Sequence, residues 1–275
     1  MLLPLRKKIL SLTLSICLCL VGPTAWADYT LNMHRGVTEI SRGIYQLHMI
    51  IFWICVVVGI IVFSAMFYAI IWHRKSRGVT AAHFHENTTV EIIWTIIPFL
   101  ILVGMAIPAT ELLIKMHDTA RDSEYSIKVT GHQWFWEYEY LGTGVRFTSL
   151  LSTPQDQIKN RDIKGQNYLL EVDNHLIVPI GKKIRFLTTA NDVVHSWWVP
   201  RLGIKKDAIP GFINEAWAII EEPGIYRGQC AELCGINHGF MPIVVEAKTE
   251  EEFNTWLEAK KASPTSHPAN TGNTP

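Results

Sequence analysis

The sequence lacks several features that would assign it to common functional classes. It contains no C-x-x-C-H motif, so it carries no attachment site for a c-type haem. Charged residues make up only 18% of the chain, and basic and acidic residues balance at 25 each, which argues against nucleic acid as a partner. Hydrophobic residues reach 48% of 275, so the scarcity of charge predicts a membrane portion.

The N-terminal residues 1–27 have the three parts of a secretory signal. A basic start precedes about thirteen apolar residues, too few to span a bilayer. Ala25-Trp26-Ala27 then forms a small-x-small cleavage site, so the mature chain is predicted to begin at Asp28. A lipid-modified cysteine is the alternative, but the residues before both cysteines of this stretch are large.

Two long apolar runs, at 48–72 and 92–114, are each long enough to cross a membrane. The loop between them carries a cluster of arginine and lysine, so the positive-inside rule places it in the cytoplasm. We therefore expect residues 28–117 to form a transmembrane helix hairpin, with the N-terminus and the large C-terminal part outside.

Residues 118–261 are expected to form an all-β domain with a short C-terminal helix. From Tyr125 onward, short runs rich in Val, Ile, Tyr and Trp alternate with turn residues, as in a Greek-key sandwich or barrel. Strands are expected at 126–140, 168–172, 176–190, 215–220, 224–227 and 243–247, with a surface excursion at 142–165. Residues 249–252 have the form of a helix capping box, and 262–275 have a composition typical of disorder.

A cluster of metal donors lies in residues 228–241, which read GQCAELCGINHGFM. Its donors are Cys230, Cys234, His238 and Met241. Thiolate and thioether are soft donors and imidazole is borderline, a set that favours copper and leaves zinc as the main competitor. A second imidazole, His195 in HSWWVP, follows an apolar run and comes from a different loop.

The two cysteines allow more than one interpretation. In an exported domain, two cysteines often form a disulfide. A Cys2His2 zinc site is another alternative, although zinc has no use for Met241 and structural zinc sites usually pair their histidines closely. Mononuclear electron-transfer copper sites use one cysteine, so a second one favours two thiolates bridging two copper ions.

Several motifs together resemble subunit II of haem-copper cytochrome c oxidase over about residues 40–260. They are HSWWVP, DAIPG, GQCAELCGINHGFMP, GHQWFWEYEY and LLEVDN. The resemblance implies a membrane-anchored cupredoxin-like Greek-key β-barrel that holds the dinuclear copper centre CuA. It implies these ligands: His195, Cys230, Cys234, His238, Met241 and the backbone carbonyl of Glu232.

The resemblance also implies a role in a larger complex of the bacterial inner membrane. CuA would take electrons from cytochrome c and pass them to haem in subunit I, where oxygen is reduced with proton pumping. Trp134 corresponds to the electron-entry tryptophan, Glu91 to an acid near a proton-uptake path, and the Glu232 carboxylate to a ligand of interfacial Mg²⁺ or Mn²⁺. The acids expected around the cytochrome docking area are Glu139, Asp173 and Asp192, in a region (residues 117–275) with 16 basic and 20 acidic residues.

Three other classes share part of this pattern. A quinol oxidase subunit has the same hairpin and barrel but has lost the metal ligands, all of which are present here. Nitrous-oxide reductase has a similar copper loop in a much longer soluble chain. A membrane-anchored copper chaperone would have an exposed, incomplete site. The predictions of membrane helices and a complete donor set separate this chain from all three.

Overall fold

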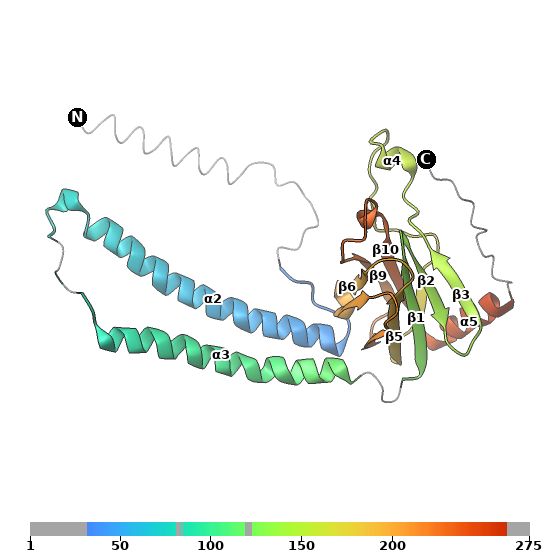
Figure 1. Cartoon of the computed structure of the whole chain (residues 1–275), viewed down its shortest axis with the longest axis horizontal. Coiled ribbons are helices and arrows are strands. Elements are labelled where there is room, and N and C mark those ends of the chain that lie inside the picture. Colours follow the sequence, from blue (N-terminus) through green and yellow to red (C-terminus); the bar gives the residue numbers. More distant parts are fainter. Residues whose placement is uncertain (1–31, 81–82, 84, 119–122, 263–275) are drawn as a thin grey trace. The chain divides into compact units, whose positions relative to one another are not determined.

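The structure, a computed structural model, describes residues 32–80, 83, 85–118 and 123–262. The predicted signal segment 1–27 lies outside these residues, and so does the predicted tail except for Ala262. The described chain comprises two long helices followed by a β-domain (Figure 1).

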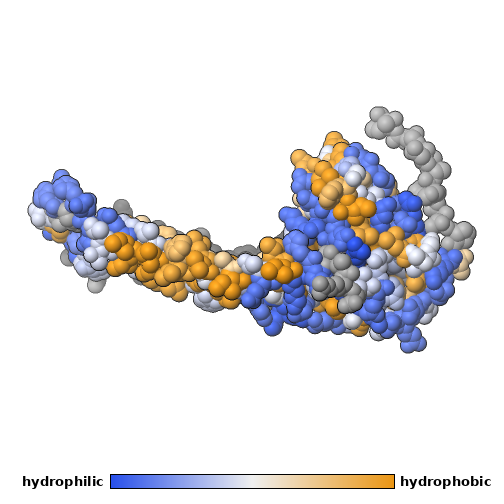
Figure 2. Space-filling view, turned by 60° about the horizontal axis from the view of Figure 1, so that its bottom comes forward, coloured by the Kyte–Doolittle hydropathy of each residue, from blue (hydrophilic) through white to orange (hydrophobic). Residues whose placement is uncertain are grey.

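The two long helices contain the predicted membrane spans. Helix α2 covers Glu39–Trp72 and α3 covers Thr88–His117, with the short 3-10 helix η1 (Lys75–Arg77) between them. Both helices are long and apolar enough to cross a membrane, by length and composition. Figure 2 shows the hydrophobic side chains as a band along this helix pair. Helices α2 and α3 approach each other closely at Gly43, where an added Cβ would lie 2.9 Å from Leu112 Cδ1.

Both helices extend beyond the apolar runs because polar residues cap their N-termini. Thr38 Oγ1 accepts a hydrogen bond from Ser41 N at 3.0 Å, and Ser41 Oγ accepts one from Thr38 N at 3.0 Å, which completes a capping box. Asn87 Oδ1 accepts from Val90 N at 3.2 Å at the start of α3. Glu39 near the start of α2 pairs with Lys115 in the last turn of α3, so the helices run antiparallel.

The β-domain consists of two five-stranded sheets. One has the order β3-β2-β1-β5-β8 and the other β4-β10-β9-β6-β7. The strands are β1 (Tyr125–His132), β2 (Phe135–Tyr140), β3 (Val145–Ser149), β4 (Leu176–Pro179), β5 (Lys183–Ala190), β6 (His195–Val199), β7 (Ile204–Ala208), β8 (Asn214–Ile219), β9 (Gly224–Cys230) and β10 (Pro242–Lys248). The prediction of an all-β domain behind two membrane-capable helices is confirmed.

Large aromatic side chains hold the two sheets together. Phe186 on β5 stacks on Trp197 on β6 with ring centroids 4.9 Å apart, and these strands belong to different sheets. Trp197 Nε1 also donates to Tyr138 Oη at 3.3 Å, so its polar atom has a partner inside the core. Trp136, Tyr138 and Tyr140 on β2 are all buried, as strand alternation predicts.

Some predicted strands are divided or absent. The run 126–140 is a hairpin, because β1 turns back into β2 at residues 133–134. The run 176–190 breaks into β4 and β5 at Gly181, whose φ of 70° suits a glycine turn. Residues 168–172 contribute only an isolated bridge from Val172 to Leu151, so the strand predicted there is wrong. Strand β3 lies within the predicted surface excursion at 142–165. The rest of that segment after β3 is a loop that contains the short helix α4 (Gln155–Ile158).

The predicted C-terminal helix is α5 (Glu250–Ala262), and it packs on the β-domain. Thr249 Oγ1 accepts from Glu252 N at 3.3 Å and the Glu252 carboxylate accepts from Thr249 N at 3.0 Å, so the capping box is confirmed. Phe253 and Leu257 are buried in the core cluster. Tyr125 of β1 meets the Phe253 ring edge to face at 5.0 Å.

Candidate metal centre

Two neighbouring strands bring the distant parts of the metal site together. His195 is the first residue of β6 and Cys230 is the last residue of β9. These strands are antiparallel neighbours with Trp197 opposite Cys230, so a sequence separation of 35 residues becomes a side-chain contact. The other donors follow in the loop from β9 to β10, which contains the 3-10 helix η3 (His238–Phe240).

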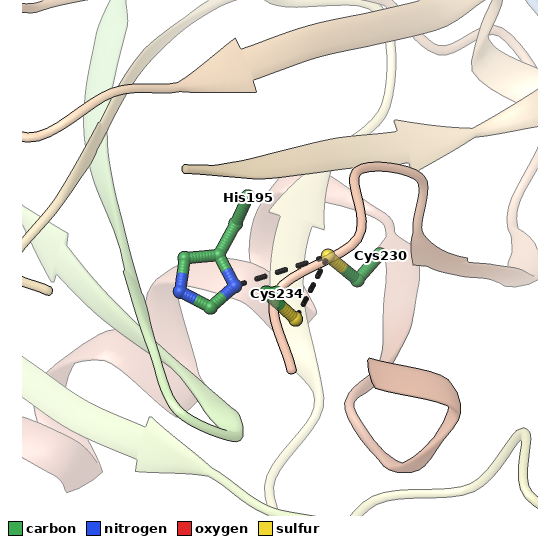
Figure 3. Close-up of side chains that lie close together, drawn as sticks. All are labelled: His195, Cys230 and Cys234. Atoms are coloured by element: carbon green, nitrogen blue, oxygen red, sulfur yellow. Dashed lines mark hydrogen bonds between the residues drawn. The ribbon is translucent and has the colours of Figure 1, made fainter. Parts of the chain in front are cut away.

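All six predicted donor atoms converge at this loop. His195 Nδ1 lies 3.9 Å from Cys230 Sγ, which lies 3.9 Å from Cys234 Sγ (Figure 3). Cys234 Sγ is 3.5 Å from both His238 Nδ1 and Met241 Sδ. The carbonyl oxygen of Glu232 is 3.3 Å from Cys230 Sγ. His195, Cys230 and Cys234 are buried and present their ligand atoms within 4.8 Å of one another.

The two thiols are arranged for metal binding. Both are free, and their separation of 3.9 Å is almost twice the length of a disulfide bond, about 2.05 Å. A metal–thiolate bond is about 2.3 Å, so two sulfurs at this separation can bind the same metal ion. With imidazole, thioether and carbonyl donors around them, this set fits copper better than zinc, which rarely uses a thioether.

The two thiols differ in acidity. Burial raises the pKa of Cys230, but the hydrogen bond with His195 and backbone groups at Glu232 and Ser196 lower it more, so its pKa lies below the ordinary value. Burial and, after it, the neighbouring Cys230 sulfur together raise the pKa of Cys234 to about 12. Binding of a cation at both sulfurs must therefore displace a proton from Cys234, which couples metal affinity to pH.

Asp192 fixes the orientation of His195. Its Oδ1 lies 2.9 Å from His195 Nε2, so the other ring nitrogen, Nδ1, faces Cys230. Burial lowers the pKa of His195, but hydrogen bonds with Cys230 and Asp192 outweigh it and leave the pKa raised. A carboxylate on the far nitrogen is the usual way to orient a histidine that binds a metal. Asp192, expected as a docking acid, thus contacts a predicted ligand directly.

The turn between β1 and β2 contacts the copper loop, by which we mean residues 230–241. Gln133 Nε2 and Trp134 Nε1 both donate to the carbonyl oxygen of Cys234, at 2.7 Å and 3.2 Å. Trp134 lies in this turn, half-buried against the core, and is less exposed than the resemblance implied. Its ring therefore reaches a predicted ligand residue through one hydrogen bond.

The remaining predicted side chains do not join the donor cluster. The Glu232 side chain is exposed, whereas its carbonyl faces Cys230. Glu139 on β2 is half-buried opposite Arg146 of β3, and Asp173 Oδ1 accepts from Leu150 N at 2.7 Å. Glu91 lies in the first turn of α3, where its carboxylate accepts from Asn87 N at 3.4 Å.

Sequence reasoning did not identify two residues that shape the site. They are Gly131 and Gln133. An added Cβ on Gly131 of β1 would lie 2.8 Å from His195 Cδ2, so only glycine leaves room for the ring. A glycine inside a strand pattern signals close approach of this kind. No comparable signal marks Gln133, because its contacts depend on how the two sheets meet.

Comparisons with known proteins give a consistent result. The family model "Cytochrome C oxidase subunit II, periplasmic domain" matches residues 125–248, and "Cytochrome C oxidase subunit II, transmembrane domain" matches residues 26–112. Cytochrome c oxidase subunit 2 of Arabidopsis thaliana is 38% identical over 231 residues, covering 83% of this chain and 88% of the relative. The mitochondrial subunit 2 of Glycine max is 39% identical over 84% of this chain, which spans 59% of that relative.

A solved structure also matches. The periplasmic domain of subunit II of cytochrome oxidase (CoxB) of Bradyrhizobium japonicum is 41% identical, covers 50% of this chain and 94% of its own, and has a TM-score of 0.45.

Proposed function

Because this chain belongs to the cytochrome c oxidase subunit II family, we propose that it receives single electrons at a dinuclear copper centre and passes them to haem in a partner subunit. The observation that carries this proposal is the convergence of two free thiols, two imidazoles, a thioether and a carbonyl at one end of the β-domain.

The arrangement of donors supports two copper ions. Each thiol has its own imidazole, with His195 3.9 Å from Cys230 and His238 3.5 Å from Cys234. Two thiols, each with its own histidine, would supply donors for two copper ions, whereas a mononuclear site would use one thiolate. When bound, the copper supplies a reversible one-electron acceptor. The chain's own residues hold the donors in place and exclude water from the buried His195.

The proposed electron donor is a basic cytochrome c. Trp134 links the surface of the β1–β2 turn to Cys234 through its Nε1 hydrogen bond, so it is the proposed entry point. Glu139, Asp173 and Asp192 are the proposed docking acids. The excess of acid over base in residues 117–275, 20 against 16, supports electrostatic steering of a basic partner.

The remaining proposals concern the oxidase complex. Subunit I would hold the haems that receive the electron and reduce oxygen with proton pumping, and the exposed Glu232 carboxylate would bind Mg²⁺ or Mn²⁺ at the interface. The basic residues around η1 favour a cytoplasmic loop, which puts the copper domain on the periplasmic side. Glu91 at the start of α3 would then lie on the cytoplasmic side, near a proton entrance.

The test is the EPR spectrum of the full chain, purified in detergent and loaded with copper. The wild type should give a seven-line hyperfine pattern from one electron shared by two copper nuclei. Cys230→Ser should abolish this pattern, since one bridging thiolate cannot hold two ions together. Met241→Leu should only modify it, because a weak axial ligand tunes the site more than it holds the metal.

Cys55→Ser is the matched control, because Cys55 is exposed within α2 and outside the donor cluster. It should leave the spectrum unchanged. A seven-line pattern that survives in Cys230→Ser would reject the bridging role.

A further inference from the structure

Gln133 contacts both chain segments that supply the copper donors. Its backbone N–H donates to Asp192 Oδ2 at 2.6 Å, and Asp192 Oδ1 holds His195 Nε2 at 2.9 Å. Its side-chain Nε2 donates to the carbonyl oxygen of Cys234 at 2.7 Å. We propose that Gln133 is a positioning residue that joins the His195 segment to the copper loop and thereby sets the reduction potential of the copper centre. This inference rests on the proposed function.

Close packing at Gly235 supports this role independently of the hydrogen bonds. Gly235 follows Cys234 and has a φ of 119°, a backbone conformation that favours glycine. An added Cβ there would lie 3.0 Å from Trp134 Cζ2 and 3.1 Å from Gln133 Nε2. The copper loop therefore packs directly against the β1–β2 turn at this point.

The hydrogen bonds have a definite electrostatic sign. Gln133 Nε2 and Trp134 Nε1 direct the positive ends of two N–H dipoles at the carbonyl of a thiolate ligand. Hydrogen bonds of this kind tune the potential of a metal site. Positive dipoles favour the reduced, more electron-rich state, so they raise the reduction potential. Loss of the Gln133 donor should therefore lower it.

The expected effect is measurable. Because Gln133 is exposed, water can replace some of the lost donor strength, and we expect a roughly threefold to tenfold shift in the electron-exchange equilibrium with a reference couple. For a one-electron centre this corresponds to a potential lower by about 30 to 59 mV. Gln133→Glu keeps the side-chain size but places a negative charge at the same carbonyl, so its potential should fall further than that of Gln133→Leu.

The experiment uses the full chain in detergent. Potentiometric titration and EPR of the copper-loaded protein should show a lower potential and a changed hyperfine splitting in Gln133→Leu. Hydrogen exchange of residues 231–240 in the copper-free chain should be faster than in wild type, because the loop has lost its contact with the turn. Gln155→Leu is the matched control, since Gln155 is an exposed glutamine in α4, outside the site.

The outcomes separate this inference from the proposed function. A wild type without the seven-line pattern would overturn the dinuclear copper assignment itself. A wild type with that pattern, together with unchanged potential and unchanged exchange in both Gln133 variants, would overturn the role of Gln133 alone. If Gln133→Leu does not fold, Gln133→Glu decides by itself: a lowered potential supports the inference and a wild-type potential rejects it.

Discussion

Gly131 offers a direct test of how tightly the β-domain holds His195. In Gly131→Ala the new methyl group would lie 2.8 Å from His195 Cδ2, 2.9 Å from Cγ and 3.1 Å from Cβ. Carbon atoms in contact prefer about 3.5–4.0 Å, so either the imidazole or strand β1 must move by several tenths of an ångström. His195 is fully buried and held by Asp192, and β1 is paired with β2 on one side and β5 on the other, so neither can move freely.

The size of the effect follows from the overlap. Overpacking a well-filled interior costs about 1–3 kcal/mol. If the ring moves, this cost falls on copper binding and weakens it by roughly 5- to 140-fold, since about 1.4 kcal/mol is a factor of ten. If β1 moves instead, the cost falls on the fold and lowers the melting temperature by about 2–4 °C per kcal/mol.

Two measurements on the full chain cover both cases. Competition with a chromophoric chelator gives copper affinity, and thermal unfolding of the copper-free chain gives stability. Gly239→Ala is the control, because an added Cβ there meets no atom within 4 Å although the residue lies beside His238. If Gly131→Ala keeps both wild-type affinity and wild-type stability, the close packing of His195 against β1 is refuted.

Three further predictions concern electron entry, the second metal and acid stability. In stopped flow, Trp134→Ala should slow reduction of the copper centre by cytochrome c at least tenfold, and Trp134→Phe should have an intermediate rate. The wild-type rate should fall between 0.01 and 0.1 M salt, because the Debye length shrinks from about 30 to about 10 Å. A salt-independent rate would contradict the role of the docking acids. In the assembled oxidase, Glu232→Gln should lower bound Mn²⁺ and leave the copper spectrum nearly unchanged, whereas the exposed control Glu222→Gln should retain Mn²⁺. Burial raises the pKa of Glu171, but hydrogen bonds from Arg227 and His175 lower it below its ordinary value of 4.5. The ionised carboxylate therefore stabilises the fold above about pH 4.5, and this contribution is lost as the pH falls through the pKa of the folded state. Glu171→Gln should therefore cost about 1–2 kcal/mol at pH 7 and less at pH 3, and equal costs at both pH values would exclude the effect.

The donor set was predictable because its chemistry is local in sequence. Cys230, Cys234, His238 and Met241 lie within one loop, and soft donors at short spacing identify a metal site before any fold is known. For His195 the sequence predicts a separate loop and no strand at 195–199, whereas the structure places it at the start of β6. The pairing of β6 with β9 brings it beside the other donors.

The surroundings of the site were not predictable in the same way. Gln133 acts through a turn that the aromatic run 126–140 concealed, because strand propensity continues across both halves of the hairpin. Gly181 is a turn residue in the sequence, yet the β-branched residues on both sides favour one continuous strand, and the structure divides the run there into β4 and β5. Contacts of Asp192 with His195 depend on where the chain turns between β5 and β6, and composition alone does not specify that geometry.

The two sheets meet at the copper loop, and this has a consequence for how the protein tolerates mutation. The predicted donors lie on β6, on β9 and in the loop after β9, all within one sheet, and Gln133 of the other sheet contacts that loop at Cys234, so a bound metal would order the loop on which this contact between the sheets depends. A ligand present at 1,000 times its dissociation constant stabilises the state that binds it by about 4.1 kcal/mol. The loaded chain would therefore survive core substitutions that unfold the copper-free chain. The metal-free chain, which lacks this stabilisation, would then set the limit on which substitutions the interior tolerates.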